Sequence, residues 1–132
     1  KRGIRVCVHI INGLPNETHE DMMQTVKELN KLGIDGIKIH LLHVLNDTPL
    51  YNYYKQGKLR LLGRKEYIEI VVDQLEILSE NIVVQRLTGD APRNKLVGPM
   101  WSTNKKVVLN EIDKLLKERD SWQGKYKEKI LE

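Results

Sequence analysis

Cysteine is nearly absent from this sequence, which has Cys7 alone among 132 residues. One thiol allows no internal disulfide, and it cannot supply the several thiolates of a structural zinc or iron–sulfur centre. Phenylalanine is missing and aromatic residues make up only 5% of the chain, so a stacking surface for single-stranded nucleic acid is poorly supplied. No apolar run approaches the ~18 residues of a spanning helix, and the N-terminus lacks the apolar core of a secretory signal. We therefore expect a soluble, cytoplasmic protein with no membrane partner.

Basic residues exceed acidic ones only slightly, with 22 Lys and Arg against 18 Asp and Glu and a net charge of +4. Residues 1–66 hold 11 basic and 7 acidic residues, whereas residues 67–132 hold 11 of each, so the excess lies in the first half. No run of five like charges occurs, which leaves nucleic-acid binding possible but not favoured. The chain begins Lys1-Arg2-Gly3 without methionine, and we expect it to be a piece of a longer protein.

Apolar periodicity predicts three strands that alternate with three helices. Thr18 and Asp21 form a capping-box pattern before the first helix, which ends at Gly33. A long connection, Asn46–Gly63, follows the second strand, and connections of this length usually carry function. The predicted strands are Ile4–Ile11, Gly36–Leu45 and Ile82–Leu87, and the predicted helices run from Thr18 to Gly33, from Arg64 or Lys65 to Ser79, and from about Thr103 to Glu118.

This order of elements predicts the α/β class, with a parallel βαβαβα arrangement and helices packed over the sheet. Three strands make a small sheet, and an open parallel sheet of that size would leave apolar edges unpaired. We therefore expect further strands from a missing N-terminal half or from a second copy of the chain. The exposed edge of the first strand predicts that this piece self-associates, as a homodimer closed by two-fold symmetry.

Alternation along the strands separates an apolar face from a polar one. The apolar face holds Ile4, Val6, Val8, Ile37 and Ile39, which we expect beneath the helices. The other face gathers the basic side chains Arg5, His9, Lys38, His40 and Arg86, which either line a functional cavity or simply face solvent. His40 and His43 resemble a metal-binding pair, but their odd spacing on a strand would direct them to opposite faces, so we expect no shared metal.

Several segments together resemble one known family. The turn Ile11–Thr18 resembles the I-x-G-L-P-G-E-T turn of many radical S-adenosylmethionine (SAM) enzymes, among them oxygen-independent coproporphyrinogen oxidases, with Asn16 where glycine is common. The downstream segments resemble the uncharacterised radical SAM family of the YhcC type over essentially the whole chain. They are Gly36–Leu45, Thr48–Tyr51, Gly57, Arg86–Arg93, Trp101, Asn104-Lys105 and Gln123–Tyr126.

The resemblance implies the C-terminal part of a partial (β/α)6 TIM-like barrel, with the barrel core in residues 1–93 and a family-specific helical extension in residues 94–132. It implies SAM as cofactor and a [4Fe–4S] cluster held by a three-cysteine motif in the missing N-terminal half. It also implies that Ile11, Asn12 and Gly13 line the adenine side of the SAM pocket, with Leu42, His43 and Val44 near the base. We therefore expect this chain alone to hold no cofactor and to be inactive.

Substrate contacts are expected where parallel strands end, since ligands of parallel α/β folds bind there. The candidates are His9, Lys38, His40, Arg86, Asp90 and Arg93, although Arg86, Asp90 and Arg93 could instead form a structural ion pair across their loop. The leading hypothesis is a fragment of an oxidoreductase-like radical SAM enzyme whose substrate is unknown. The alternative is a non-catalytic α/β module that binds RNA or an acidic partner through its basic face.

Overall fold

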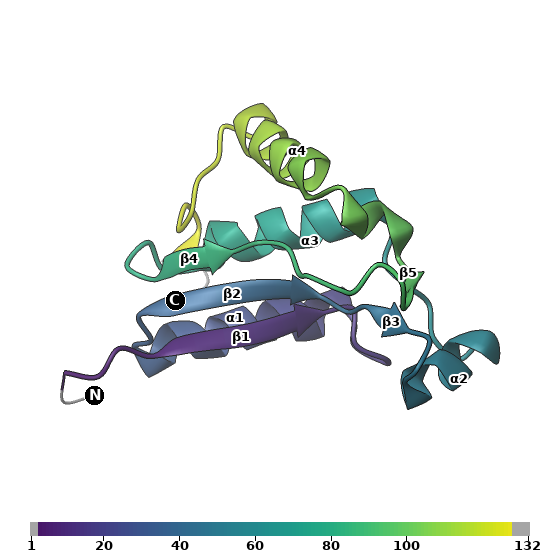
Figure 1. The fold of residues 1–132 in the computed structure, drawn as a ribbon. Helices are drawn as coiled ribbons and strands as arrows, with labels where there is room; N and C mark the ends of the chain where they lie inside the picture. The colour runs from purple at the N-terminus through teal and green to yellow at the C-terminus, as the bar shows by residue number, and fades with distance from the viewer. Residues whose placement is uncertain (1–2, 128–132) are drawn as a thin grey trace.

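A three-stranded parallel sheet forms the centre of the computed structural model, which describes residues 3–127. The strands lie in the order β1 (Cys7–Asn12), β2 (Gly36–Leu41) and β4 (Val83–Arg86). Helices α1 (His19–Leu32) and α3 (Arg64–Ile77) cover one face, and α4 (Lys105–Glu118) packs against α3 (Figure 1). The predicted α/β class with parallel strands is confirmed. The remaining elements are β3 (Val44–Leu45), α2 (Pro49–Lys55), β5 (Leu96–Gly98) and the 3₁₀ turn η1 (Met100–Thr103).

The first helix begins and ends where the sequence predicts. The Thr18 hydroxyl accepts from the Asp21 amide and the Asp21 carboxylate accepts from the Thr18 amide, so the capping box is complete. Gly33 ends the helix in the left-handed conformation with φ of 64°. Met22, Val26 and Leu29 are buried on the face that the helical spacing brings together. Local capping and periodicity therefore suffice to define α1.

The core lies between the sheet and α3. Ile37 and Ile39 of β2 are fully buried, and so are Val71 and Val72 of α3. Because α3 is covered by the sheet on one side and by α4 on the other, its buried residues extend around most of the helix. Tyr67 contributes one polar group to this core, and its hydroxyl donates to the Leu87 carbonyl at 2.7 Å. Burial raises the pKa of Tyr67 well above its ordinary value.

The predicted first strand is too long at its start. The ladder with β2 begins at the pair Cys7 and Gly36, and no strand accompanies the residues before it. Ile4 is 69% exposed and Val6 is 38% exposed, so the prediction that both lie beneath the helices is wrong. Instead, the backbone amide of Val6 donates to the Asp35 carboxylate at 2.7 Å, beyond the end of the ladder. The length of the neighbouring strand therefore limits β1.

The second predicted strand and the long connection also differ from expectation. The parallel ladder ends at Leu41, and Val44–Leu45 pairs antiparallel with β5 instead of continuing β2. The connection 46–63 contains α2, which begins with Pro49 at its first position. The expected boundary after residue 93 falls between β4 and β5, and residues 128–132 of the expected extension lie outside the described residues. The division into domains stays a prediction.

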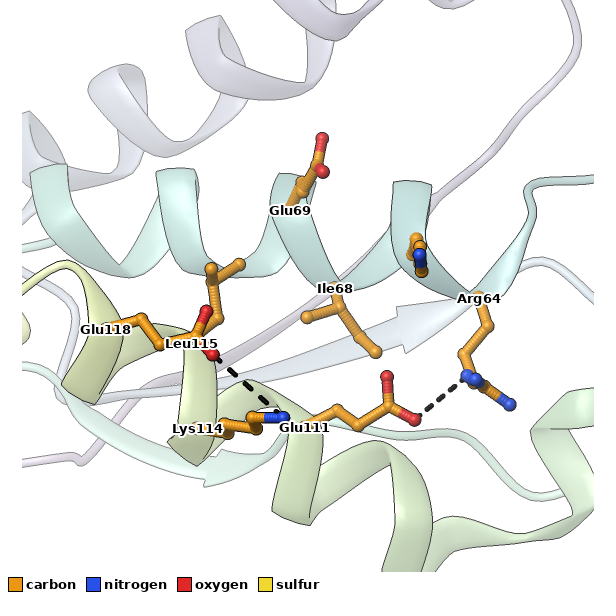
Figure 2. A pocket seen from close by; sticks show the side chains of 8 residues that line it. Arg64, Ile68, Glu69, Glu111, Lys114, Leu115 and Glu118 are labelled. Atoms are coloured by element: carbon orange, nitrogen blue, oxygen red, sulfur yellow. Dashed lines mark ion pairs between the residues drawn. The ribbon is translucent and has the colours of Figure 1, made fainter.

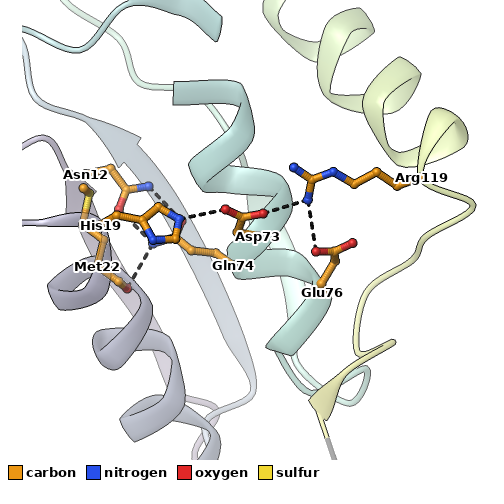
Figure 3. A network of polar contacts seen from close by, with 7 residues as sticks. All are labelled: Asn12, His19, Met22, Asp73, Gln74, Glu76 and Arg119. Atoms are coloured by element: carbon orange, nitrogen blue, oxygen red, sulfur yellow. Dashed lines mark hydrogen bonds and ion pairs between the residues drawn. The ribbon is translucent and has the colours of Figure 1, made fainter. Parts of the chain in front are cut away.

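Polar contacts connect α1, α3 and the chain after α4 (Figure 3). His19 lies 2.7 Å from one oxygen of Asp73, and Arg119 donates to the other oxygen at 2.7 Å. The same guanidinium donates to the buried Glu76 at 3.1 Å, and the Ser121 hydroxyl donates to Glu76 at 2.6 Å. The hydrogen bonds to Asp73 raise the pKa of Arg119. This network holds α1, α3 and the chain after α4 together, and it does not involve the opposite face of the sheet.

Candidate functional site

The sheet face turned away from α1 and α3 carries the predicted basic side chains. In the parallel register, His9 lies beside Lys38 and Ile11 lies beside His40, so all four share one face. The ring centroids of His9 and His40 are 5.1 Å apart, with His40 Nε2 at 3.1 Å from His9 Nδ1. The predicted phase of these two strands is therefore confirmed for His9, Lys38 and His40.

A bulge in β4 brings Arg86 to the same face. Val84 pairs with Ile37, but Lys38 pairs with Arg86, so Gln85 is skipped in the ladder. Without this extra residue, alternation would direct Arg86 to the same side as Val84, toward the helices. Arg5 precedes the start of β1 and does not belong to the sheet. The basic face thus consists of His9, Lys38, His40 and Arg86.

The two stacked histidines restrict each other's protonation. Only one hydrogen fits between His40 Nε2 and His9 Nδ1 at 3.1 Å, so one ring donates and the other accepts. Partial burial lowers the pKa of His40, and the charges of His9, Arg86 and Lys38 lower it further. Near neutral pH the His40 ring on this face is therefore uncharged, although Lys38 and Arg86 are close enough to lower its pKa.

His43 lies close to His40 rather than on the opposite side of the sheet. The sequence-based argument from odd spacing is wrong, because the ladder ends at Leu41 and His43 belongs to the turn before β3. A methyl group on Gly89 would lie 3.5 Å from His43 Nδ1 and 3.6 Å from His40 Nδ1, so both rings approach the backbone of Gly89. Within residues 3–127, no group of three or more His, Cys, Asp or Glu side chains is arranged to hold a metal ion.

A hollow of about 290 Å³ opens beside His43, at the carboxyl ends of the strands. It brings together three of the predicted site residues, His43, Asp90 and Arg93. Ser102, Thr103 and Lys105 also line it, and sequence reasoning missed all three. They belong to η1 and the start of α4. Lys105 lies in one of the segments that resemble the family, but no pattern in the sequence assigns any of the three to the site. We call this feature the His43 hollow.

Charges around the His43 hollow are unevenly matched. Asp90 pairs with Arg86 at 3.0 Å through one oxygen and with Lys105 through the other. The structural ion pair left open by the sequence is therefore present for Arg86 and Asp90. Arg93 lines the hollow and forms no ion pair or hydrogen bond through its side chain with any residue in 3–127. Two cations thus share the Asp90 carboxylate, and a third, Arg93, lies beside them without an acidic partner among residues 3–127.

The two segments predicted to contact SAM lie side by side. The amide of Leu42 donates to the carbonyl of Asn12 at 2.9 Å, which joins the ends of β1 and β2. Ile11 is 43% exposed on the basic face, and His43 and Leu42 are half-buried. These three residues are therefore at least partly accessible to a ligand.

Three other residues predicted to contact SAM, which are Asn12, Gly13 and Val44, pack against other parts of the protein. The Asn12 amide is buried and exchanges hydrogen bonds of 2.8 and 2.9 Å with Gln74 of α3 (Figure 3). Val44 is fully buried. Gly13 has φ of +98°, and a methyl group there would lie 3.1 Å from Leu62. Asn12 and Val44 therefore offer almost no surface to a ligand, whereas Gly13 is half-buried, and the roles of all three in binding SAM stay predictions.

A cluster does not fit this chain. Cys7 is the only cysteine, and it is exposed at the first residue of β1, at the opposite end of the strand from Gly13. A [4Fe–4S] cluster is held by several thiolates, so its ligands must come from outside these residues.

A larger hollow, of about 540 Å³, lies between α3 and α4 (Figure 2). Ile68 and Leu115 form its apolar part, and Arg64 pairs with Glu111 at 3.0 Å across it. Its basic residues are balanced by acidic ones, and all of them lie on two packed helices, away from the ends of the strands. We assign it to helix packing.

Unfolding should become easier as the pH falls below about 6.5, because His40 and His43 have lowered pKa values. For His43 the causes are burial, then the charges of His40 and Lys105. Below about pH 6.5 the two histidines bind protons more readily in the unfolded chain than in the folded protein. Their contribution to stability is therefore complete above about pH 6.5, and it is lost as the pH falls toward their lower pKa values in the folded protein. Urea unfolding at several pH values between about 5 and 8 measures it. A His40→Gln/His43→Gln variant should show a smaller decrease, and an equal decrease would contradict the assignment.

None of the helices within residues 3–127 is both long and apolar enough to cross a membrane. Residues 34–118 match the Radical_SAM C-terminal domain family. The chain is 50% identical over 132 residues to the uncharacterised protein YtqA of Bacillus subtilis, covering all of this chain and 41% of that protein. It is 29% identical over 118 residues to YhcC of Escherichia coli, covering 89% of this chain and 38% of that protein.

More distant similarities extend to proteins with named activities. The chain is 26% identical over 105 residues to a tRNA uridine(34) acetyltransferase of Methanocaldococcus jannaschii, covering 77% of this chain and 19% of that protein. The structure of Methanocaldococcus infernus Elp3 with an N-terminal deletion has a TM-score of 0.77 and 20% identity, covering 92% of this chain and 29% of that one. This likeness supports the fold, a part of a TIM-like barrel. The chain spans about 40% of the length of YtqA and YhcC.

Proposed function

Because this chain belongs to the Radical_SAM C-terminal domain family, we propose that it forms the substrate-side part of an enzyme that reductively cleaves SAM. A [4Fe–4S] cluster, held by residues outside this chain, would supply the one electron that cleavage of SAM requires. The chain itself orients SAM and substrate and shields the site from water. The resemblance to the YhcC type, seen in the sequence, agrees with the relatives found.

One observation carries this proposal: the SAM segments and the candidate substrate residues meet at the same edge of the sheet. Gly13 follows β1, His43 follows β2 and Asp90 follows β4, so each comes after the carboxyl end of a parallel strand. Parallel α/β folds bind their ligands at this edge. The hydrogen bond between Leu42 and Asn12, together with the His43 hollow, supports a single site in which the proposed cofactor and substrate segments adjoin.

Substitution of Ile11 by glutamate tests the SAM site in the full-length protein. Ile11 is 43% exposed on the basic face, so the variant should fold. In the proposed complex, the new carboxylate would lie against the adenine of SAM. We expect SAM binding to weaken about tenfold or more, a loss of about 1.4 kcal/mol, because the ligand would have to desolvate the new carboxylate. Equilibrium dialysis measures binding, and methionine release under anaerobic reduction measures cleavage.

Val83→Glu is the matched control for this experiment. Val83 is 62% exposed and β-branched like Ile11, but it lies at the first residue of β4, at the amino edge of the sheet. SAM binding should be unchanged in this variant. Equal weakening in both variants, or none in Ile11→Glu, would exclude the proposed position of SAM.

RNA is the second candidate ligand. The acetyltransferase from M. jannaschii is named for a tRNA uridine, and the basic face offers His9, Lys38, His40 and Arg86 on one side of the sheet. A non-catalytic module would bind RNA without releasing methionine from SAM, whereas an RNA-modifying enzyme would do both. Filter binding of tRNA to the full-length protein at increasing salt distinguishes these, because contacts to phosphates weaken steeply with salt.

The chain on its own should self-associate through β1. This strand lies at the edge of the sheet and pairs only with β2 among the described strands, so its outer amides and carbonyls are open to another chain. A two-fold dimer would cover this edge, with more than ~1,000 Å² buried in total. Light scattering at micromolar concentration checks this, and a clean monomer of 15.4 kDa would contradict it.

A further inference from the structure

The His43 hollow has the size of a binding site for one chemical group or a small molecule. Its volume is about 290 Å³, at the lower end of the ~300–1,000 Å³ typical of ligand pockets. It is lined from four parts of the chain: His43, the loop residues Gly89 to Ala91 and Arg93, Leu96 of β5, and Ser102, Thr103 and Lys105. The family resemblance implies that His43 lies near the base of SAM, but it assigns no chemical group to the hollow itself.

The charge of the His43 hollow favours an anion. Asp90 is the only carboxylate that lines it, and both of its oxygens are engaged by Arg86 and Lys105. Arg93 has no acidic partner within residues 3–127. The hollow also lies at the N-terminus of α4, a helix of 14 residues, where the helix dipole adds positive potential. A cation would therefore be repelled, and an anion would be paired.

Hydrogen bonding at the inner wall fixes how the His43 ring is protonated. The Ser102 hydroxyl donates to the Pro99 carbonyl at 2.7 Å, so its oxygen is left to accept. His43 Nε2 lies 3.2 Å from that oxygen and must be the donor. Burial lowers the pKa of His43, so the ring is neutral near pH 7 and Nδ1 carries a free lone pair. Nδ1 lies on the side of the ring that faces Gly89, a second lining residue.

We propose that the His43 hollow binds an anionic group of the substrate, a carboxylate or a phosphate, through Arg93 and Lys105, while His43 Nδ1 accepts a hydrogen bond from an adjacent O–H or N–H of the same molecule. A guanidinium fork beside an ammonium suits either anion. The Thr103 hydroxyl lines the same hollow but already donates to the Met100 carbonyl at 2.9 Å, so towards a ligand its oxygen can only accept. The identification of the ligand as the substrate rests on the proposed function, whereas the binding of an anion does not.

Three small probes separate the two parts of the proposal. Acetate and inorganic phosphate test the anion contact, and glycolate adds one hydroxyl beside a carboxylate. Calorimetric titration of the full-length protein, without SAM or reductant, should show binding of acetate and phosphate and tighter binding of glycolate than of acetate. Because no SAM is present, the result does not depend on whether the protein cleaves SAM.

Two variants and a control identify the residues. Arg93→Gln should weaken all three probes about tenfold, the usual loss for a hydrogen bond to a charged group. His43→Phe removes Nδ1 but keeps a ring, so it should bind acetate as before and lose the preference for glycolate. Arg60→Gln changes an exposed arginine that is paired with Glu66, and it should leave all affinities unchanged. Thermal melting of each variant checks folding.

Two results would overturn the inference. If Arg93→Gln binds phosphate and acetate as tightly as the unchanged protein, any anion binding lies elsewhere. If glycolate and acetate bind equally before substitution, His43 does not accept a hydrogen bond from the ligand. Because His43→Phe is judged by the ratio of two affinities, a general loss of stability does not imitate the expected result.

Discussion

The chain alone is expected to take up no stoichiometric [4Fe–4S] cluster and to release no methionine from SAM. Its only cysteine is Cys7, and a cluster needs several thiolates. Without a cluster there is no electron source for the sulfonium bond, so the expected loss relative to the full-length protein is complete. Iron content, the visible absorbance of an anaerobically reconstituted sample and methionine release are the three measurements.

A matched substitution shows whether Cys7 is involved in the cluster. In the full-length protein, Cys7→Ser should leave both iron content and methionine release unchanged, because Cys7 is exposed at the amino end of β1 and the site lies at the carboxyl end. A stoichiometric cluster on the isolated chain would overturn the division of roles proposed above. Loss of iron in the Cys7→Ser protein would do so as well.

Truncation of Ile39 to alanine is expected to destabilise the protein more than any surface change. Ile39 is fully buried in the middle of β2, under both helices of the covered face. Replacing a buried isoleucine by alanine costs about 2–5 kcal/mol, through lost burial and the cavity that remains. Since a domain of this size is stable by roughly 5–15 kcal/mol, this is a large share of the total. The midpoint of urea unfolding measures the decrease.

Leu32→Ala serves as the control for the core substitution. Leu32 ends α1 and is 66% exposed, so its truncation should change the free energy of unfolding by less than about 0.5 kcal/mol. A similar loss in both variants would show that the helices do not pack on the sheet as described. The two changes remove aliphatic side chains of the same size, so only their burial differs.

Features set by short stretches of sequence could be predicted well. The capping box at Thr18, the end of α1 at Gly33 and the shared face of His9 and His40 all follow from contacts within a few residues or from simple alternation. The α/β class follows in the same way from the order of strands and helices. These features needed no knowledge of which distant segments meet.

Features that depend on distant partners could not be predicted. The first strand is shorter than its apolar run because the ladder with β2 begins at Gly36, and Val6 bonds to Asp35 outside the ladder. His43 lies near His40 because the parallel ladder stops at Leu41 and the chain turns toward β5. Ser102 and Lys105 join the site only through the fold of residues 96–105. The roles in binding SAM and substrate remain predictions for the experiments above.

The buried pair of Asn12 and Gln74 also restricts how β1 can be placed during folding. Both amides are satisfied only when Asn12 faces the helices. If β1 slipped by one residue along β2, its side chains would exchange faces, and Gln74 would lose its partner inside the core. His9 would then be buried, and Ile10 would be left in water. A misaligned β1 is therefore penalised twice, so an edge strand that is paired on one side only still has a single favoured alignment.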